Sequence, residues 1–392
     1  MKAIAPGMDR ISGEGAFEYL AKAQGLEREG AHVLHFEIGQ PDFPTPLHIK
    51  EAAFKAINEN YTGYVAAGGI ADLKAAIQEE IKRTRGFKPG ADQILVLPGA
   101  KPGIFFSMLA LVEAGDEVLY PDPAFPTYGS LVKYLNAADG AIPVKEENEF
   151  RLDPADIKKR LTAKTKLIIL NSPQNPTGSV MTKDALLATA ELAQKHGVYI
   201  LSDEIYSKML YDAAFYSPAA LDEAKERTLI LDGFSKSYSM TGWRLGYLVG
   251  PAAIIKKMEI LMINALSCTA SFVQKAGIAA LEGSQEDLHK MMAAFRERRA
   301  AIVKGLNEIP GFSCLAPKGA FYAFPNIKKT GKTSREVADD LLYKAGVCCL
   351  PGSAFGPGGE GYLRFSYAAS VETINEAVGK IKKACPKNKQ YR

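Results

Sequence analysis

The chain has 392 residues, of which 47% are hydrophobic and 23% charged, a composition typical of a globular protein long enough for two domains. Its 48 basic and 44 acidic residues leave a net charge of only +4, which argues against a nucleic-acid groove or an anionic membrane as partner. The five cysteines are scattered and lack CxxC spacing, so we expect neither a disulfide framework nor a metal site.

The sequence gives no sign of a secretory signal or a membrane span. The first ten residues, MKAIAPGMDR, lack the apolar segment of a signal peptide. The apolar run IFFSMLALV (104–112) is too short to cross a bilayer, and we therefore expect a cytoplasmic protein. The basic ending KKACPKNKQYR is predicted to be a solvated helix end followed by a frayed tail.

The predicted elements begin with helices over residues 14–29 and 46–60. From about residue 90, short apolar runs alternate with stretches of helical periodicity. The runs are ILVL (94–97), EVLY (117–120), LIIL (167–170), VYIL (198–201), TLIL (228–231) and LGYLVG (245–250). This alternation predicts an α/β fold with a mostly parallel sheet between two layers of helices.

The last third of the chain follows a different pattern. After a long charged helix near 284–308, the segments FYAF, VCCL and YLRFSY alternate with helices in an α+β pattern. We therefore expect an N-terminal arm (1–13), a smaller α+β domain made of residues 14–45 and 285–392, and a large α/β domain over residues 46–284.

Polar residues concentrate where the predicted strands end. The loops are PGAKPG (98–103), PDPAFPTY (121–128), NSPQNPTG (171–178), SDEIY (202–206) and GFSKSYSMTGWRLGY (233–247). Ligands of open parallel sheets bind beyond the carboxyl ends of the strands, so these loops are predicted to meet at one site.

Taken singly, most of these residues also have a purely structural interpretation. Gly99 to Lys101 form either a tight turn or an anion site at a helix start, and Asp203 could be a helix cap. Lys236 is harder to explain structurally, because a partly desolvated lysine near a second cation, Arg244, has the lowered pKa that an amine needs to attack a carbonyl.

The segment GFSKSYSMTGWRLG resembles the lysine signature of the class I pyridoxal-phosphate aminotransferases, enzymes of fold type I similar to aspartate aminotransferase. The resemblance implies that pyridoxal 5'-phosphate is the cofactor and that Lys236 binds its aldehyde through a C=N bond. It also implies that Ser235 and Arg244 hold the cofactor's phosphate.

The other loops resemble landmarks of the same family, in the same order along the chain. By this resemblance, Asp203 pairs with the pyridine nitrogen and makes the ring an electron sink, so that Lys236, Asp203 and Tyr206 are the expected catalytic residues. Tyr206 and Asn175 would bind the ring's 3' oxygen, Phe125 would stack on the ring, and Gly99, Ala100 and Lys101 would offer backbone amides to the phosphate.

The resemblance also implies substrate contacts and a partner. Arg364 in YLRFSY would clamp the α-carboxylate of the amino acid, near Asn175 and Gly39 of the segment that closes over the substrate. Tyr64 resembles a tyrosine that reaches the phosphate from a neighbouring subunit, which implies a homodimer with shared sites. The peptide before Pro176 is a candidate for the cis form.

The implied reaction is transfer of an amino group from an L-amino acid to a 2-oxo acid by a ping-pong mechanism. Lys101 resembles a lysine that meets the distal carboxylate of aspartate or glutamate, so aspartate with 2-oxoglutarate is the leading pair. A solvated Lys101, alanine or aromatic donors, and a β-eliminating carbon-sulfur lyase or a synthase of the same fold remain open. A dehydrogenase is disfavoured because the match to GxGxxG, residues 356–361, precedes its strand, and a non-catalytic sensor is disfavoured because Lys236 and Asp203 are both present.

Overall fold

The computed structural model describes residues 4–221 and 225–384, and its main feature is a seven-stranded sheet in the order β2-β8-β7-β6-β5-β3-β4. Strand β8 runs opposite to the other six strands of this sheet, which confirms the predicted mostly parallel sheet. The strands are β2 (Ile94–Leu97), β3 (Glu117–Asp122), β4 (Ala138–Pro143), β5 (Thr165–Asn171), β6 (Tyr199–Asp203), β7 (Thr228–Gly233) and β8 (Gly246–Val249).

Strand β4, with the sequence ADGAIP, was not predicted. It is an edge strand, and most of its residues remain partly or fully exposed. Because glycine, proline and aspartate are tolerated at an edge but depleted in central strands, the sequence of β4 does not resemble a buried strand.

Helices cover both faces of the sheet, as predicted, because alternate residues of each strand point to opposite faces. Leu95 and Leu97 of β2 pack in the same cluster as the helices α4 (Lys101–Leu111), α5 (Thr127–Tyr134) and α8 (Ala252–Leu266). On the opposite face, Ile94 and Val96 pack with α2 (Leu47–Asn58), α3 (Ala71–Arg85) and α9 (Ser271–Glu282), while α6 (Pro154–Arg160) and α7 (Lys183–His196) cover the β3 to β6 region.

Local sequence signals set several helix ends. The Thr182 hydroxyl accepts a hydrogen bond from the backbone N–H of Ala185 and caps α7, which ends at Gly197 in the left-handed conformation. The helix predicted over residues 46–60 is confirmed as α2, and the one predicted over 14–29 is confirmed as α1 (Gly15–Arg28).

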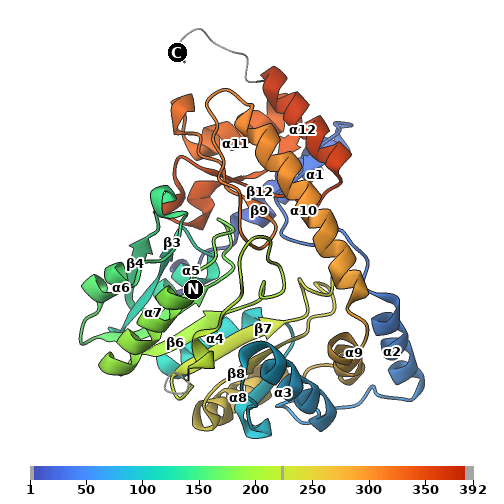
Figure 1. The fold of residues 1–392 in the computed structure, drawn as a ribbon, viewed down its shortest axis with the longest axis vertical. Coiled ribbons are helices and arrows are strands. Elements are labelled where there is room, and N and C mark those ends of the chain that lie inside the picture. Colours follow the sequence, from blue (N-terminus) through green and yellow to red (C-terminus); the bar gives the residue numbers. More distant parts are fainter. Residues whose placement is uncertain (1–3, 222–224, 385–392) are drawn as a thin grey trace.

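The last third of the chain packs with α1 against one side of this α/β unit (Figure 1). Strand β1 (Leu34–His35) pairs with β10 (Val347–Cys348), and β11 (Leu350–Pro351), β12 (Leu363–Ser366) and β9 (Tyr322–Ala323) form a second small sheet. The helices are α10 (Glu286–Asn307), α11 (Ser334–Ala345) and α12 (Val371–Ala384). This is the predicted α+β pattern, whereas the domain boundaries at residues 13, 45 and 284 remain a prediction.

Some expectations fall on residues outside the described ranges. Cys385 and the basic tail that follows it are among them. Within residues 4–221 and 225–384, none of the helices combines the length and apolar character needed to cross a membrane.

Candidate active site

A cavity of about 390 Å³ lies at the carboxyl ends of the sheet strands and receives residues from all five predicted loops. The predicted site residues that line it are Gly39, Ala100, Lys101, Phe125, Asn175, Asp203, Tyr206, Ser235, Lys236, Arg244 and Arg364. Gly99 adjoins it through Arg244. The structure therefore brings twelve of the thirteen predicted residues together.

Tyr64 is the exception. Its side chain is 91% exposed and does not line the cavity of its own chain. Its predicted contact with a neighbouring subunit's site stays a prediction.

Lys236 follows the end of β7, and its Nζ donates a hydrogen bond of 2.6 Å to the carbonyl oxygen of Gly39. Burial lowers its pKa to about 8, helped by the positive charges of Arg364, Arg244 and Lys101. A lysine with this pKa offers a neutral amine near physiological pH, so Lys236 can act as a nucleophile and as a base.

Asp203 is the last residue of β6, and its buried side chain lines the cavity. Burial raises its pKa to about 6, while a hydrogen bond of 2.6 Å from the Tyr128 hydroxyl and one from the Ile205 N–H oppose the rise. Asp203 is therefore mostly ionised at pH 7 and can pair with a cationic group in the cavity. Tyr128 was not predicted, although it lies in the loop PDPAFPTY.

A cluster of donors suited to an anion surrounds the start of α4. Gly99 has a φ of +91°, and a Cβ at this position would lie 2.2 Å from the Arg244 guanidinium, so glycine lets that cation approach the helix N-terminus. Pro102 in the first turn of α4 has no N–H, and the Gly103 N–H donates to the Ala100 carbonyl, so the backbone N–H groups left for an anion beside Ser235 are those of Ala100 and Lys101.

Arg364 on β12 is buried and also lines the cavity. Its Nη2 donates to the carbonyl oxygen of Glu37, and its Nη1 lies 3.5 Å from Oδ1 of Asn175. Its Nε has no hydrogen-bond partner among the described residues. A buried guanidinium with an unsatisfied N–H is a strong binding group for a carboxylate.

Two tyrosines, Tyr206 and Tyr322, lie next to Arg364. The hydroxyls of Tyr206 and Tyr322 are 2.7 Å apart, and the Arg364 guanidinium lies 4.7 Å from the Tyr322 ring centroid. Tyr322 was missed because the segment FYAF reads only as an apolar strand. The peptide before Pro176 is cis, as expected, and the peptides before Pro123 and Pro173 are also cis.

At the mouth of the cavity, Lys101 forms an ion pair with Glu14, which we call the rim pair. The Lys101 side chain is 41% exposed and that of Glu14 is 22% exposed, and Nζ of Lys101 also lies 5.2 Å from the centroid of the Phe125 ring. Glu14 was not predicted, because nothing in the local sequence before α1 indicates a contact 87 residues away.

The fold and site define an α/β protein with a lysine of lowered pKa, a buried carboxylate and a buried arginine with a free N–H in one cavity. Residues 31–381 match the family described as "Aminotransferase class I and II". The chain is 42% identical over 354 residues to "Aspartate aminotransferase" of Pyrococcus horikoshii, covering 90% of each chain. It is 39% identical to "Aromatic-amino-acid aminotransferase 2" of Thermococcus litoralis, covering 94% of each chain.

A similar solved structure is the aspartate aminotransferase of Thermus thermophilus with maleate. It superposes with a TM-score of 0.94 at 32% identity, over 98% of this chain and 100% of that chain. The protein belongs to the class I and II aminotransferases and is an enzyme that transfers amino groups.

Proposed function

We propose that this aminotransferase uses pyridoxal 5'-phosphate bound to Lys236, with L-aspartate as amino donor and 2-oxoglutarate as acceptor. The observation that carries the proposal is the position of three groups in one cavity: the Lys236 amine, the Asp203 carboxylate and the Arg364 guanidinium.

The residues present fit this cofactor. The donors around Gly99, Ser235 and Arg244 suit the phosphate, and Asp203, ionised above pH about 6, suits a protonated pyridine nitrogen. Phe125 lines the cavity and could cover the ring, while Tyr206 and Asn175 could bind its 3' oxygen. Once bound, the cofactor supplies an electron sink for the bonds at the substrate's α-carbon.

The chain's own residues account for the remaining steps. Arg364 binds the α-carboxylate through its free N–H and so orients the substrate. The Lys236 amine, with its pKa lowered to about 8, accepts the α-proton and delivers it again as general base and acid.

Lys101 supports the choice of a dicarboxylic substrate, since a cation at the cavity mouth can meet a side-chain carboxylate. The names of the P. horikoshii relative and the T. thermophilus structure, the latter with the dicarboxylate maleate, are consistent with this choice. The rim pair places a condition on a dicarboxylic substrate: its side-chain carboxylate must displace Glu14 from Lys101 or bind beside it. A partly exposed ion pair contributes only about 0.2–1 kcal/mol, so a substrate carboxylate can compete with Glu14.

Aromatic donors are the second candidate, favoured by the rim pair itself. With Glu14 in place, Lys101 is neutralised and the mouth of the cavity presents the rings of Phe17 and Phe125. The T. litoralis relative is named for aromatic amino acids.

Three experiments test the function. Reduction of the cofactor-saturated protein with borohydride, followed by digestion, should yield a modified peptide that contains Lys236, and its absence would contradict the cofactor assignment.

A half-reaction screen, followed by absorbance, should show that aspartate reacts faster than phenylalanine or alanine. Reaction of aspartate no faster than that of phenylalanine would favour the second candidate. Release of pyruvate from an S-substituted cysteine without a 2-oxo acid would identify a lyase instead.

We also propose a homodimer in which Tyr64 completes the partner's phosphate site. Large exposed apolar side chains cluster in sequence around Tyr64, including Phe54, Ile57 and Tyr61, as a subunit interface requires. Mixing and reassembling inactive Lys236→Ala with Tyr64→Ala should restore activity, because one site of the mixed dimer then has both residues intact. No recovery in a verified mixed dimer would contradict shared sites.

A further inference from the structure

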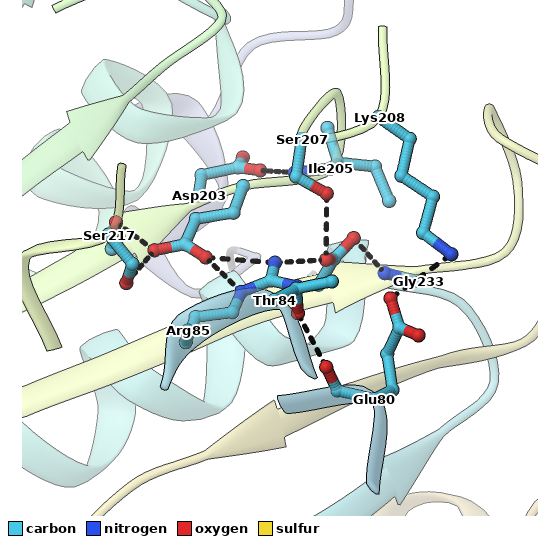
Figure 2. Close-up of polar contacts among 12 residues, drawn as sticks. Glu80, Thr84, Arg85, Asp203, Ile205, Ser207, Lys208, Ser217 and Gly233 are labelled. Carbon is cyan, nitrogen blue, oxygen red and sulfur yellow. Dashed lines mark hydrogen bonds and ion pairs between the residues drawn. The ribbon is translucent and has the colours of Figure 1, made fainter. Parts of the chain in front are cut away.

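A buried charge cluster lies beside the cavity and does not line it. We define it as Glu80, Arg85, Glu204, Lys208 and Asp232 (Figure 2). At its centre, the Arg85 guanidinium at the end of α3 donates to Glu204 Oε2 at 3.0 Å and to Asp232 Oδ2 at 2.5 Å. The side chains of Arg85 and Glu204 are each 1% exposed, so water screens little of this interaction.

The two carboxylates that Arg85 binds lie next to proposed catalytic residues. Glu204 directly follows Asp203, and Asp232 on β7 lies four residues before Lys236. Strands β6 and β7 pair in parallel, with Asp203 opposite Leu231, so Asp203, Glu204 and Asp232 converge at neighbouring strand ends.

Other donors fix the carboxylates without adding positive charge. Ser202 and Ser217 donate to Glu204, while Ser207 and the Gly233 N–H donate to Asp232. Lys208 binds Glu80 at 3.0 Å, so much of its charge is directed to that partner. Among the described residues, Arg85 is thus the cation that contacts both Glu204 and Asp232.

We propose that Arg85 is a positioning residue of the active site, which holds the ends of β6 and β7 together and offsets the negative charges of Glu204 and Asp232 beside Asp203. The inference rests on the proposed pairing of Asp203 with the cofactor. Without the positive charge of Arg85, the two neighbouring carboxylates would favour protonation of Asp203 and weaken its hold on a cationic ring.

A purely structural role is the alternative, because buried ion pairs are weak evidence of any special function. The two roles predict different directions for the shift in Asp203 protonation. If Arg85 acts through charge, loss of Arg85 and loss of Glu204 should move the protonation of Asp203 in opposite directions, whereas structural damage should weaken the site in both cases.

The charged and titratable groups around Asp203 come from several elements. They are Tyr128 on α5, Asp232 on β7, Glu204 and Tyr206 on the segment after β6, and Lys236 and Arg364 across the cavity. All of them except Glu204 and Asp232 stay unchanged in the variants below.

The test measures the affinity of apoenzyme for pyridoxal phosphate as a function of pH. In the wild type, affinity should fall below pH about 6 as Asp203 takes up a proton. We call the pH at which the affinity begins to fall the break. In Arg85→Met the break should move up by about one pH unit, which makes cofactor binding about fivefold weaker at pH 6. In Glu204→Gln the break should move down, because a like charge is removed.

Further variants keep the result interpretable. Arg85→Lys retains the charge without the forked geometry and should give a smaller upward shift, which covers the case that Arg85→Met does not fold. The triple variant Arg85→Met, Glu204→Gln, Asp232→Asn should bring the break back to or below the wild-type pH. Arg83→Met, on the same helix but 60% exposed, is the matched control and should leave the break unchanged.

Three results would overturn the inference. Unmoved breaks in the Arg85 and Glu204 variants would do so, as would a uniform loss of affinity at every pH in all of them. If the wild type itself binds no pyridoxal phosphate, the proposed function fails first and the role of Arg85 fails with it.

Discussion

The rim pair and the buried charge cluster are built from the same interaction and differ mainly in their contact with water. Lys101 and Glu14 are 41% and 22% exposed, whereas Arg85 and Glu204 are each 1% exposed. Water weakens and replaces the first interaction, so a substrate carboxylate can compete for Lys101. The second cannot exchange partners with solvent, so it can hold neighbouring strand ends in a fixed arrangement.

This difference suits the two regions to different parts of the proposed reaction. The rim pair lies where side chains of different donors would enter, and its small energy suits a selective but adjustable contact. The buried charge cluster lies beside the proposed cofactor pair, where a constant arrangement of charge is needed.

The largest effect should come from breaking the buried charge cluster. Arg85→Met leaves two buried carboxylates without their cation and should lower the free energy of unfolding by about 3–5 kcal/mol, measured by urea denaturation of the apoenzyme. The control Arg83→Met removes an exposed partner of Glu80 and should cost less than about 1 kcal/mol. Equal losses in both variants would mean that burial does not distinguish the two arginines.

The next largest effect concerns Asp203, which lines the cavity and directly precedes Glu204 of the buried charge cluster. Asp203→Ala should still bind the cofactor but lower the turnover number by about 10²–10³-fold, because the charge that supports the reaction is lost. Burial raises the pKa of the Asp203 carboxyl to about 6, so its charge at pH 7 does not stabilise the fold. Removing that charge should therefore not lower the stability of the apoenzyme at pH 7. Turnover near that of the wild type would refute the catalytic role.

A smaller effect is expected at the rim. Glu14→Gln frees Lys101 and should raise the ratio of kcat/KM for aspartate to that for phenylalanine by about fivefold, which corresponds to about 1 kcal/mol. Glu18→Gln is the control, because Glu18 lies one turn further along α1 and pairs with Lys22 and Arg335 instead. An unchanged donor ratio in Glu14→Gln would remove the rim pair from substrate selection.

The smallest effect is a shift in the pH dependence of Lys236. Only the neutral amine attacks the aldehyde, so the rate at which apoenzyme forms the C=N link should rise with pH through about 8. Glu14 raises the pKa of Lys236 and Lys101 lowers it, so the midpoint should fall in Glu14→Gln and rise in Lys101→Met, each by a few tenths of a unit. Absorbance-monitored rates between pH 6 and 10 measure both midpoints, and shifts of the same sign would contradict this arrangement.

The sequence by itself determined the sheet strands from β2 to β8 apart from β4, the main helices, and eleven of the residues that line the cavity. These features depend on local patterns: apolar runs of strand length, helical periodicity with caps such as Thr182 and Gly197, and polar loops after strands. The edge strand β4 escaped because its residues are only partly buried, which weakens the pattern.

Only the tertiary structure decided which distant side chains meet. Glu14 reaches Lys101 across 87 residues, Arg85 reaches Glu204 across 119, and Tyr322 reaches Tyr206 across 116. No local pattern carries such pairings, because they result from packing α1, α3 and the small sheet against the strand ends. The physical reason is that propensity and periodicity act within a few residues, whereas the burial and pairing of charges depend on the folded chain as a whole.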